Sequence, residues 1–198
     1  MIDNIRATFE QELKDLQDQV MAMIITVMEM LKKSMIAYQK NDDKLALEVV
    51  RIDDKVDKYN NDIETKCLQL IATQQPMAKD LRLIASTMRI VMDIERMGDY
   101  TVDVTKFIRR LIGKPKLPSA GDIPKMAELV EKMLQETMEA ISKKDLGMIT
   151  KIIEDDENVD AALRNMFDTA LLEIEKRPLS AREAVYQLFI ARYLERVA

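Results

Sequence analysis

The sequence predicts an all-α protein, in which two tandem three-helix repeats form an elongated six-helix bundle. Three observations lead to this prediction. Glycine and proline are scarce, at 4 and 5 of 198 residues, whereas good helix formers are abundant. Apolar residues recur at alternating steps of three and four, which is the spacing of a helix face. A short acidic sequence also occurs twice, about a hundred residues apart.

The first predicted helix covers residues 3–40. Its apolar positions have the spacing of a bundle or coiled-coil seam: Ile5, Phe9, Leu13, Leu16, Val20, Ile24, Val27, Leu31, Met35 and Tyr38. The polar cluster Asn41-Asp42-Asp43 then predicts a turn that supplies an N-cap for the next helix.

The second helix is predicted at 43–74 and the third at about 77–112. The break between them is expected at Gln75-Pro76, because proline disfavours the α conformation in the residue before it. Residues 113–121 hold two glycines and two prolines and predict a linker. Three more helices follow, at about 123–144, up to about 176, and from near Ser180 onward, with a break at Arg177-Pro178.

The internal repeat divides the chain into residues 1–112 and 122–198. Asp53-Asp54-Lys55-Val56-Asp57 is echoed by Asp156-Glu157-Asn158-Val159-Asp160, and Glu95-Arg96 by Glu195-Arg196. On this pattern the second repeat is expected to be truncated at its C-terminal end, because the acid four residues after Glu195 would fall beyond Ala198.

Paired carboxylates are the clearest candidate site. Two acids four residues apart lie on one helix face, and such acids recur in both repeats: Asp53, Asp57, Glu95 and Asp99 in the first, and Asp156, Asp160 and Glu195 in the second. Glu95 continues the apolar spacing of its helix, which predicts a core-facing carboxylate. Gly98 would let a neighbouring helix or an ion approach the backbone.

A multivalent cation would relieve the repulsion within such a cluster. Histidine is absent and the single Cys67 lies on an apolar face, so the ligands would be oxygens, which suit iron, Mn²⁺, Mg²⁺ or Ca²⁺. Two alternatives remain open: the acids form ordinary solvated faces, or Glu95 pairs with a buried arginine such as Arg82 or Arg89. The seven-residue recurrence of Arg82, Arg89 and Arg96 is typical of a solvated face, with a docking ridge for an acidic partner as the alternative.

Other function classes receive no support from the composition. The net charge of -5 and the lack of a basic cluster argue against nucleic-acid binding. No nucleophile–histidine pair and no glycine-rich phosphate loop is present. A single cysteine and the lack of a signal-peptide pattern lead us to expect a cytoplasmic protein.

The chain resembles the PhoU family. The resemblance is carried by residues 70–82 (Leu-Ile-Ala-Thr-Gln-Gln-Pro-Met-Ala-Lys-Asp-Leu-Arg), by Asp93-Ile94-Glu95-Arg96-Met97-Gly98-Asp99, and by the acidic signature from Asp53 to Asp57 with its echo. It covers essentially the whole chain and implies a pair of three-helix repeats, commonly in a homodimer. It also implies that the seven acids bind a multinuclear metal cluster.

The resemblance further implies a regulator of phosphate homeostasis that is not an enzyme. Such a protein would couple the ATPase subunit of a phosphate ABC transporter to a membrane sensor histidine kinase. It would repress the phosphate-starvation response, restrain phosphate uptake, and meet the membrane only through its partners. Asp103 departs from the asparagine that the family pattern leads us to expect. The alternatives are a metal-dependent phosphoesterase with a multinuclear carboxylate site and a purely structural helical scaffold.

Overall fold

The described part of the chain is helical and contains no strand. The structure is a computed structural model that describes residues 2–115, 117 and 122–198, with side chains from residue 6 onward. The helices are α1 (Ile2–Lys40), α2 (Asp43–Gln74), α3 (Lys79–Leu111), α4 (Asp122–Lys143), α5 (Leu146–Lys176) and α6 (Ala181–Val197), with a 3-10 turn, η2 (Pro178–Ser180), before α6. No helix in this part of the chain is both long and apolar enough to cross a bilayer.

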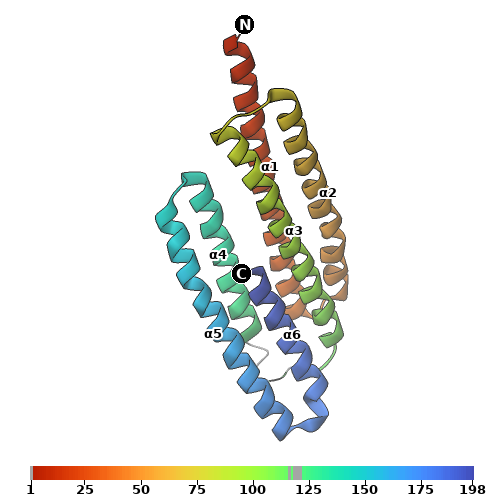
Figure 1. The fold of residues 1–198 in the computed structure, drawn as a ribbon. Helices are drawn as coiled ribbons and strands as arrows, with labels where there is room; N and C mark the ends of the chain where they lie inside the picture. The colour runs from red at the N-terminus through yellow and green to blue at the C-terminus, as the bar shows by residue number, and fades with distance from the viewer. Residues whose placement is uncertain (1, 116, 118–121) are drawn as a thin grey trace.

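The helices form two three-helix bundles that lie side by side and are shifted along their long axis (Figure 1). α1, α2 and α3 pack against one another, and α4 and α5 pack with α6. The two bundles meet mainly where α3 packs on α6, and also where α4 contacts α1. The predicted elongated six-helix architecture of two repeats is therefore confirmed.

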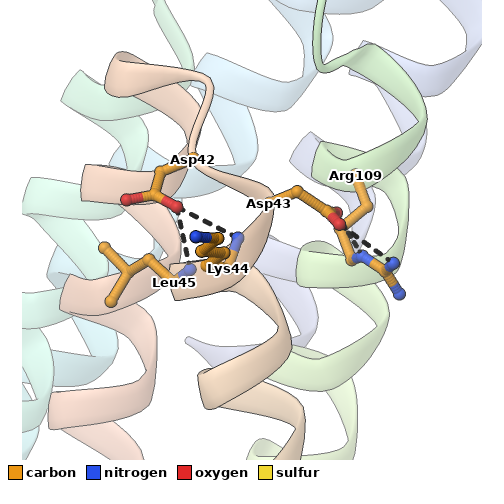
Figure 2. Close-up of polar contacts among 5 residues, drawn as sticks. All are labelled: Asp42, Asp43, Lys44, Leu45 and Arg109. Carbon is orange, nitrogen blue, oxygen red and sulfur yellow. Dashed lines mark hydrogen bonds and ion pairs between the residues drawn. The ribbon is translucent and has the colours of Figure 1, made fainter.

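The turn before α2 fixes the start of that helix. The Asp42 carboxylate accepts hydrogen bonds from the backbone N–H groups of Lys44 and Leu45, both at 3.0 Å (Figure 2). This is the N-cap that the sequence predicted. In the same view Asp43 accepts a hydrogen bond from Nε of Arg109 at 2.6 Å, which ties the start of α2 to the last turn of α3.

The same turn occurs again before α5. Asp145 accepts from the backbone N–H groups of Gly147 and Met148 at 2.8 and 3.2 Å. The residue before each cap has φ 54, at Asn41 and at Lys144. The sequence repeat is thus also a repeat of backbone geometry.

The third helix begins later than predicted. Pro76 lies outside the helix, and α3 starts at Lys79 rather than at 77. Gln75 and Ala78 both have positive φ, 45 and 47, so the chain turns twice before helical geometry resumes. Within the predicted linker, residues 116 and 118–121 lie outside the described residues. Leu117 is buried against Ala170 and Ala184, which anchors the linker to α5 and α6.

Two apolar cores hold the molecule together. One lies among α2, the first two-thirds of α1 and the first two-thirds of α3, and it includes Cys67. The other combines the C-terminal parts of α1 and α3 with α4, α5 and α6. A buried hydroxyl pair, Ser34 Oγ and Thr105 Oγ1 at 2.7 Å, joins α1 to α3 near the second core. Because the second core uses helices of both repeats, the repeats are packed into one unit.

Candidate metal centre

The site in the first repeat is built where α2 and α3 approach closely at Gly98. A Cβ atom on this buried glycine would lie 3.1 Å from Asp53 Oδ1 and 3.1 Å from Val56 Cγ1. Such contacts are tighter than packed side chains normally make. The lack of a side chain at Gly98 therefore brings Asp53 of α2 against the turn of α3 that carries Glu95 and Asp99. The neighbour that Gly98 admits is the helix α2, one of the two roles predicted for it.

Burial and the mutual repulsion of neighbouring carboxylates raise pKa values within this group. Burial raises the pKa of Asp53 to about 6, and the charges of Asp57, Asp99, Glu95 and Asp54 add to the effect. The pKa of Glu95 is also raised, first by burial and then by Asp99 and Asp57, while Arg96 opposes the shift. The structure thus brings all four predicted acids of the first repeat near one another.

Glu95 does not occupy the core position that the sequence predicted. Ile94 is the buried residue at this turn, and Glu95 is half-buried beside it. The buried line of α3 takes a step of three from Val91 to Ile94 and then a step of four to Gly98, whereas the predicted line took these two steps in the opposite order, through Glu95. Glu95 therefore lies at the rim of the core.

The alternative of a buried arginine partner for Glu95 is wrong. Arg82 and Arg89 are both exposed on α3. Among the described residues, the carboxylates of Asp53, Asp57, Glu95 and Asp99 make no hydrogen bond or salt bridge. They form a cluster of like charges without a cationic neighbour in direct contact.

The acids of the second repeat are arranged differently. Asp156 and Asp160 are half-buried on α5, and burial, then Asp160 and Glu157, raise the pKa of Asp156. Glu195 of α6 is also half-buried, but its Oε2 accepts from Arg192 Nη1 at 2.7 Å. Glu195 is not among the charges that act on Asp156. The structure brings the α5 pair together without adding Glu195 to it.

The chemistry of the first cluster suits a hard cation. All of its donors are carboxylate oxygens, and Cys67 is buried in the apolar core, where burial raises the pKa of its thiol to about 11. Within the described residues, however, no three Asp, Glu or Cys side chains are arranged to hold one ion. Ion binding would therefore require the carboxylates to rotate toward a common point from their present rotamers.

The sequence analysis missed two acids between α4 and α5. Glu136 Oε2 and Asp155 Oδ2 are buried oxygens without a hydrogen bond, and Lys132 Nζ lies 3.7 and 3.6 Å from these two side chains. Lys151 Nζ also lies 3.8 Å from Glu136. The one signal in the sequence was the acidic run around Asp155. Glu136 is remote from that run in sequence and reaches it because α4 packs against α5.

Comparison with known proteins finds one family over both repeats. The sequence model of the PhoU domain matches residues 20–108 and 123–198. A protein of Clostridium acetobutylicum named "Phosphate-specific transport system accessory protein PhoU homolog" is 31% identical, over 97% of this chain and 88% of its own length. A protein of Aquifex aeolicus with the same name is 32% identical, over 94% of this chain and 84% of its own.

Solved structures show the same fold. PhoU from Pseudomonas aeruginosa superposes with a TM-score of 0.90 at 27% identity, covering 96% of this chain and 91% of that one. The phosphate transport system regulatory protein PhoU from Streptococcus pneumoniae superposes with a TM-score of 0.88 at 24% identity, over 96% and 89% of the two chains.

Proposed function

The chain belongs to the PhoU family, and we propose that it is an accessory regulator of a phosphate-specific transport system. The observation that carries this proposal is the match of both repeats to one family, together with relatives of that name about a third identical over nearly the whole chain. In this role the protein binds other proteins and catalyses no reaction.

Within that role we propose a cytoplasmic adaptor with two partners. One is the ATPase subunit of the phosphate ABC transporter, and the other is the cytoplasmic region of a membrane sensor histidine kinase. Contact with both lets the adaptor restrain uptake and repress the phosphate-starvation response when phosphate is plentiful. The names of the relatives support association with the transporter. We further propose that the adaptor is a homodimer, which sedimentation equilibrium would test.

A capture experiment tests the adaptor role. The immobilised full chain is expected to retain the purified ATPase subunit and the purified kinase region, each at micromolar concentration. Retention of neither partner would contradict the adaptor role. Release of phosphate from p-nitrophenyl phosphate in Mn²⁺ or Mg²⁺, abolished by Glu95→Ala, would instead support the phosphoesterase alternative.

We also propose that Asp53, Asp57, Glu95 and Asp99 bind hard cations in a multinuclear cluster, and that Asp156, Asp160 and Glu195 form a second site. Three features support the first site: all-oxygen donors, carboxylates of raised pKa, and the close helix approach at Gly98. In the second site, Glu195 must exchange its contact with Arg192 for the ion. When bound, the metal would neutralise the repelling charges and bridge two helices.

Thermal unfolding tests metal binding. After treatment with a chelator, added Mn²⁺, iron or Mg²⁺ should raise the melting temperature, because a ligand at about 100 times its Kd stabilises a protein by about 2.7 kcal/mol. Asp53→Asn should abolish most of the increase, whereas Asp62→Asn, at an exposed position on the same helix, should leave it unchanged. If the ions give no increase and metal analysis finds none bound, the scaffold alternative holds.

A further inference from the structure

An apolar groove lies between α5 and α6. It has a volume of about 300 Å³ and is lined by Leu163, Phe167, Val185, Leu188, Phe189 and Arg192. Phe167 is 52% exposed, Phe189 43% and Val185 39%. Large apolar side chains gathered around a hollow mark an interaction surface more often than single exposed residues do.

Arginines lie along the α6 side of this groove. Five residues of α6 at steps of three and four share its outer face: Arg182, Val185, Phe189, Arg192 and Arg196. On the neighbouring helix α3, Arg110 lies over the ring of Phe107 at 5.1 Å and over Tyr186 of α6 at 5.5 Å. One side of the apolar groove is therefore rich in arginine, with Arg192 paired to Glu195 at 2.7 Å, although the chain as a whole has a net charge of -5.

The two repeats differ at several positions of this surface. At the repeat positions corresponding to Phe167 and Phe189, the first repeat has Glu64 and Arg89. Leu163 corresponds to Asn60, and Val185 to Ala85. Leu188 and Arg192 correspond to Met88 and Met92, so the first repeat also has apolar side chains on this face, but it has no aromatic residue at either phenylalanine position. Phe189 stacks on Phe107 of α3 with ring centroids 4.7 Å apart, and Leu163 and Leu188 pack against the second core. Phe167 and Val185 are exposed and belong to neither of these contacts.

We propose that the groove binds an amphipathic helix of a partner protein that has glutamate or aspartate beside its apolar anchor residues. A helix laid into a groove places its side chains at i, i+3, i+4 and i+7 against the apolar wall, which suits the space between two antiparallel helices. Acidic residues on the flank that faces α6 would meet Arg182 and Arg196 and would compete with Glu195 for Arg192. The inference deepens the proposed adaptor role by giving the chemistry of one partner, and it does not depend on the metal.

Charge and shape favour this occupant over two others. In a two-fold interface the same surface meets itself, so a second copy would bring the arginines of both groove borders together. A bilayer would contact a convex apolar surface, whereas this one is hollowed. An acidic amphipathic helix satisfies both the concave apolar wall and the arginine-rich side of the groove.

A peptide-binding experiment tests the proposal. The probe is a fluorescent helical peptide of about 18 residues, with leucines at i, i+3, i+4 and i+7 and glutamates on both flanks. Its anisotropy should rise saturably with the full-length chain. Phe167→Glu should weaken binding by about tenfold or more, because it removes an apolar contact of the groove. Arg182→Glu combined with Arg196→Glu should weaken binding to a similar extent, because it removes the charge contacts beside the groove. A peptide with lysine in place of each glutamate should bind at least about tenfold more weakly.

Two matched variants control for general effects. Leu68→Glu places the same charge at an apolar residue that is 53% exposed on α2, and Arg89→Glu reverses a charge at the α3 position equivalent to Phe189. Neither should change the affinity. Circular dichroism of all variants should show unchanged helix content, because the substituted side chains are on the surface.

Four outcomes would overturn the proposal. They are no peptide binding up to about 1 mM, equal weakening by the control variants, binding to phosphatidylglycerol vesicles but not to the peptide, and self-association that Phe167→Glu abolishes. If the peptide binds as expected while the transporter subunit and the kinase region are not retained, the groove stands and the proposed adaptor role fails.

Discussion

At the scale of single residues, Asp53 is half-buried and lies near other carboxylates, and both features make the stability of the protein depend on pH. Its pKa of about 6 in the folded protein lies above the ordinary value of 3.8. Between these values the folded state binds more protons than the unfolded state, so the free energy of unfolding falls as pH rises through that window. At pH 7 the ionised Asp53 therefore destabilises the metal-free protein.

Asp53→Asn should stabilise the metal-free protein at pH 7 by an amount on the order of 1 kcal/mol, after allowance for solvent screening of a half-buried group. The variant should also lose part of the gain in stability that the unaltered chain shows between pH 7 and pH 5. Urea unfolding at several pH values measures both effects. Asp62→Asn, at an exposed position, is the control, and equal behaviour of the two variants would contradict the argument.

Gly98 disfavours the helix that contains it, but it permits the close approach of α2 to α3. Replacing glycine by alanine within a helix normally stabilises by about 1 kcal/mol. Here the added Cβ would meet Val56 Cγ1 at 3.1 Å, and Val56 is fully buried and cannot move aside. Crowding of this kind costs about 1–3 kcal/mol.

Gly98→Ala should therefore lower the free energy of unfolding by about 1 kcal/mol rather than raise it. Chemical denaturation at pH 7 measures the change. Ala85→Gly, at an exposed site of the same helix, gives the size of the intrinsic helix preference without crowding. A stabilised Gly98→Ala protein would show that α2 does not approach α3 as closely as the structure has it.

At the scale of helices, the two duplicated caps fix where α2 and α5 begin. Asp42 and Asp145 each accept two backbone hydrogen bonds from the first turn that they precede. Each cap follows a residue with φ 54, which reverses the chain after α1 or α4. The shared geometry predicts that the two caps contribute similarly to stability.

Asp42→Ala and Asp145→Ala should each destabilise the protein by about 1 kcal/mol, because each leaves backbone N–H groups of a first turn without their acceptor. Asp42→Asn and Asp145→Asn should restore most of the loss, since asparagine caps as well as aspartate. Equilibrium unfolding in urea compares the four variants. An alanine variant as stable as the unaltered chain would rule out that cap.

At the scale of the whole molecule, the second core joins the two repeats. It combines Leu31 and Met35 of α1 and Ile108 of α3 with residues of all three helices of the second repeat. Tyr38 of α1 is buried in it as well, and burial raises the pKa of its hydroxyl to about 12, although a hydrogen bond with Gln187 of α6 opposes the shift. The repeats should therefore unfold together.

Ile108→Ala should cost about 2–5 kcal/mol, because Ile108 is fully buried and the substitution leaves a cavity. Amide hydrogen exchange should show the loss in α2 and in α5 alike. Ile25→Ala, at a residue 53% exposed on α1, should change little. Reduced protection confined to one repeat would show that the repeats unfold independently.

The helices were predictable because their signals are local. Asp42 stood in a polar cluster ahead of an apolar face, and Pro178 followed the end of α5, so caps and breaks could be placed from neighbouring residues. The start of α3 could not be predicted in this way, because the positive φ of Ala78 delays the helix and no glycine marks that position. Cys67 was predicted on an apolar helix face, and it is fully buried.

The candidate site was predicted only in part. The repeat identified the acids, but helix spacing allowed either Ile94 or Glu95 as the core position after Val91, and the fold buries Ile94 and leaves Glu95 at the rim. Which acids meet depends on how two helices pack. Gly98 brings Asp53 of α2 close to its partners on α3. The groove at Phe167 and Phe189 likewise required the pairing of α5 with α6.

The sequence by itself determined the helices, their turns, the internal repeat and the family, because periodicity, capping and proline breaks act over a few residues. Only the tertiary structure decided that four acids of the first repeat share a rim and that α1 and α3 complete the core of the second repeat. These features depend on distances between residues remote in sequence, which are set by the packing of whole helix faces rather than by local preference.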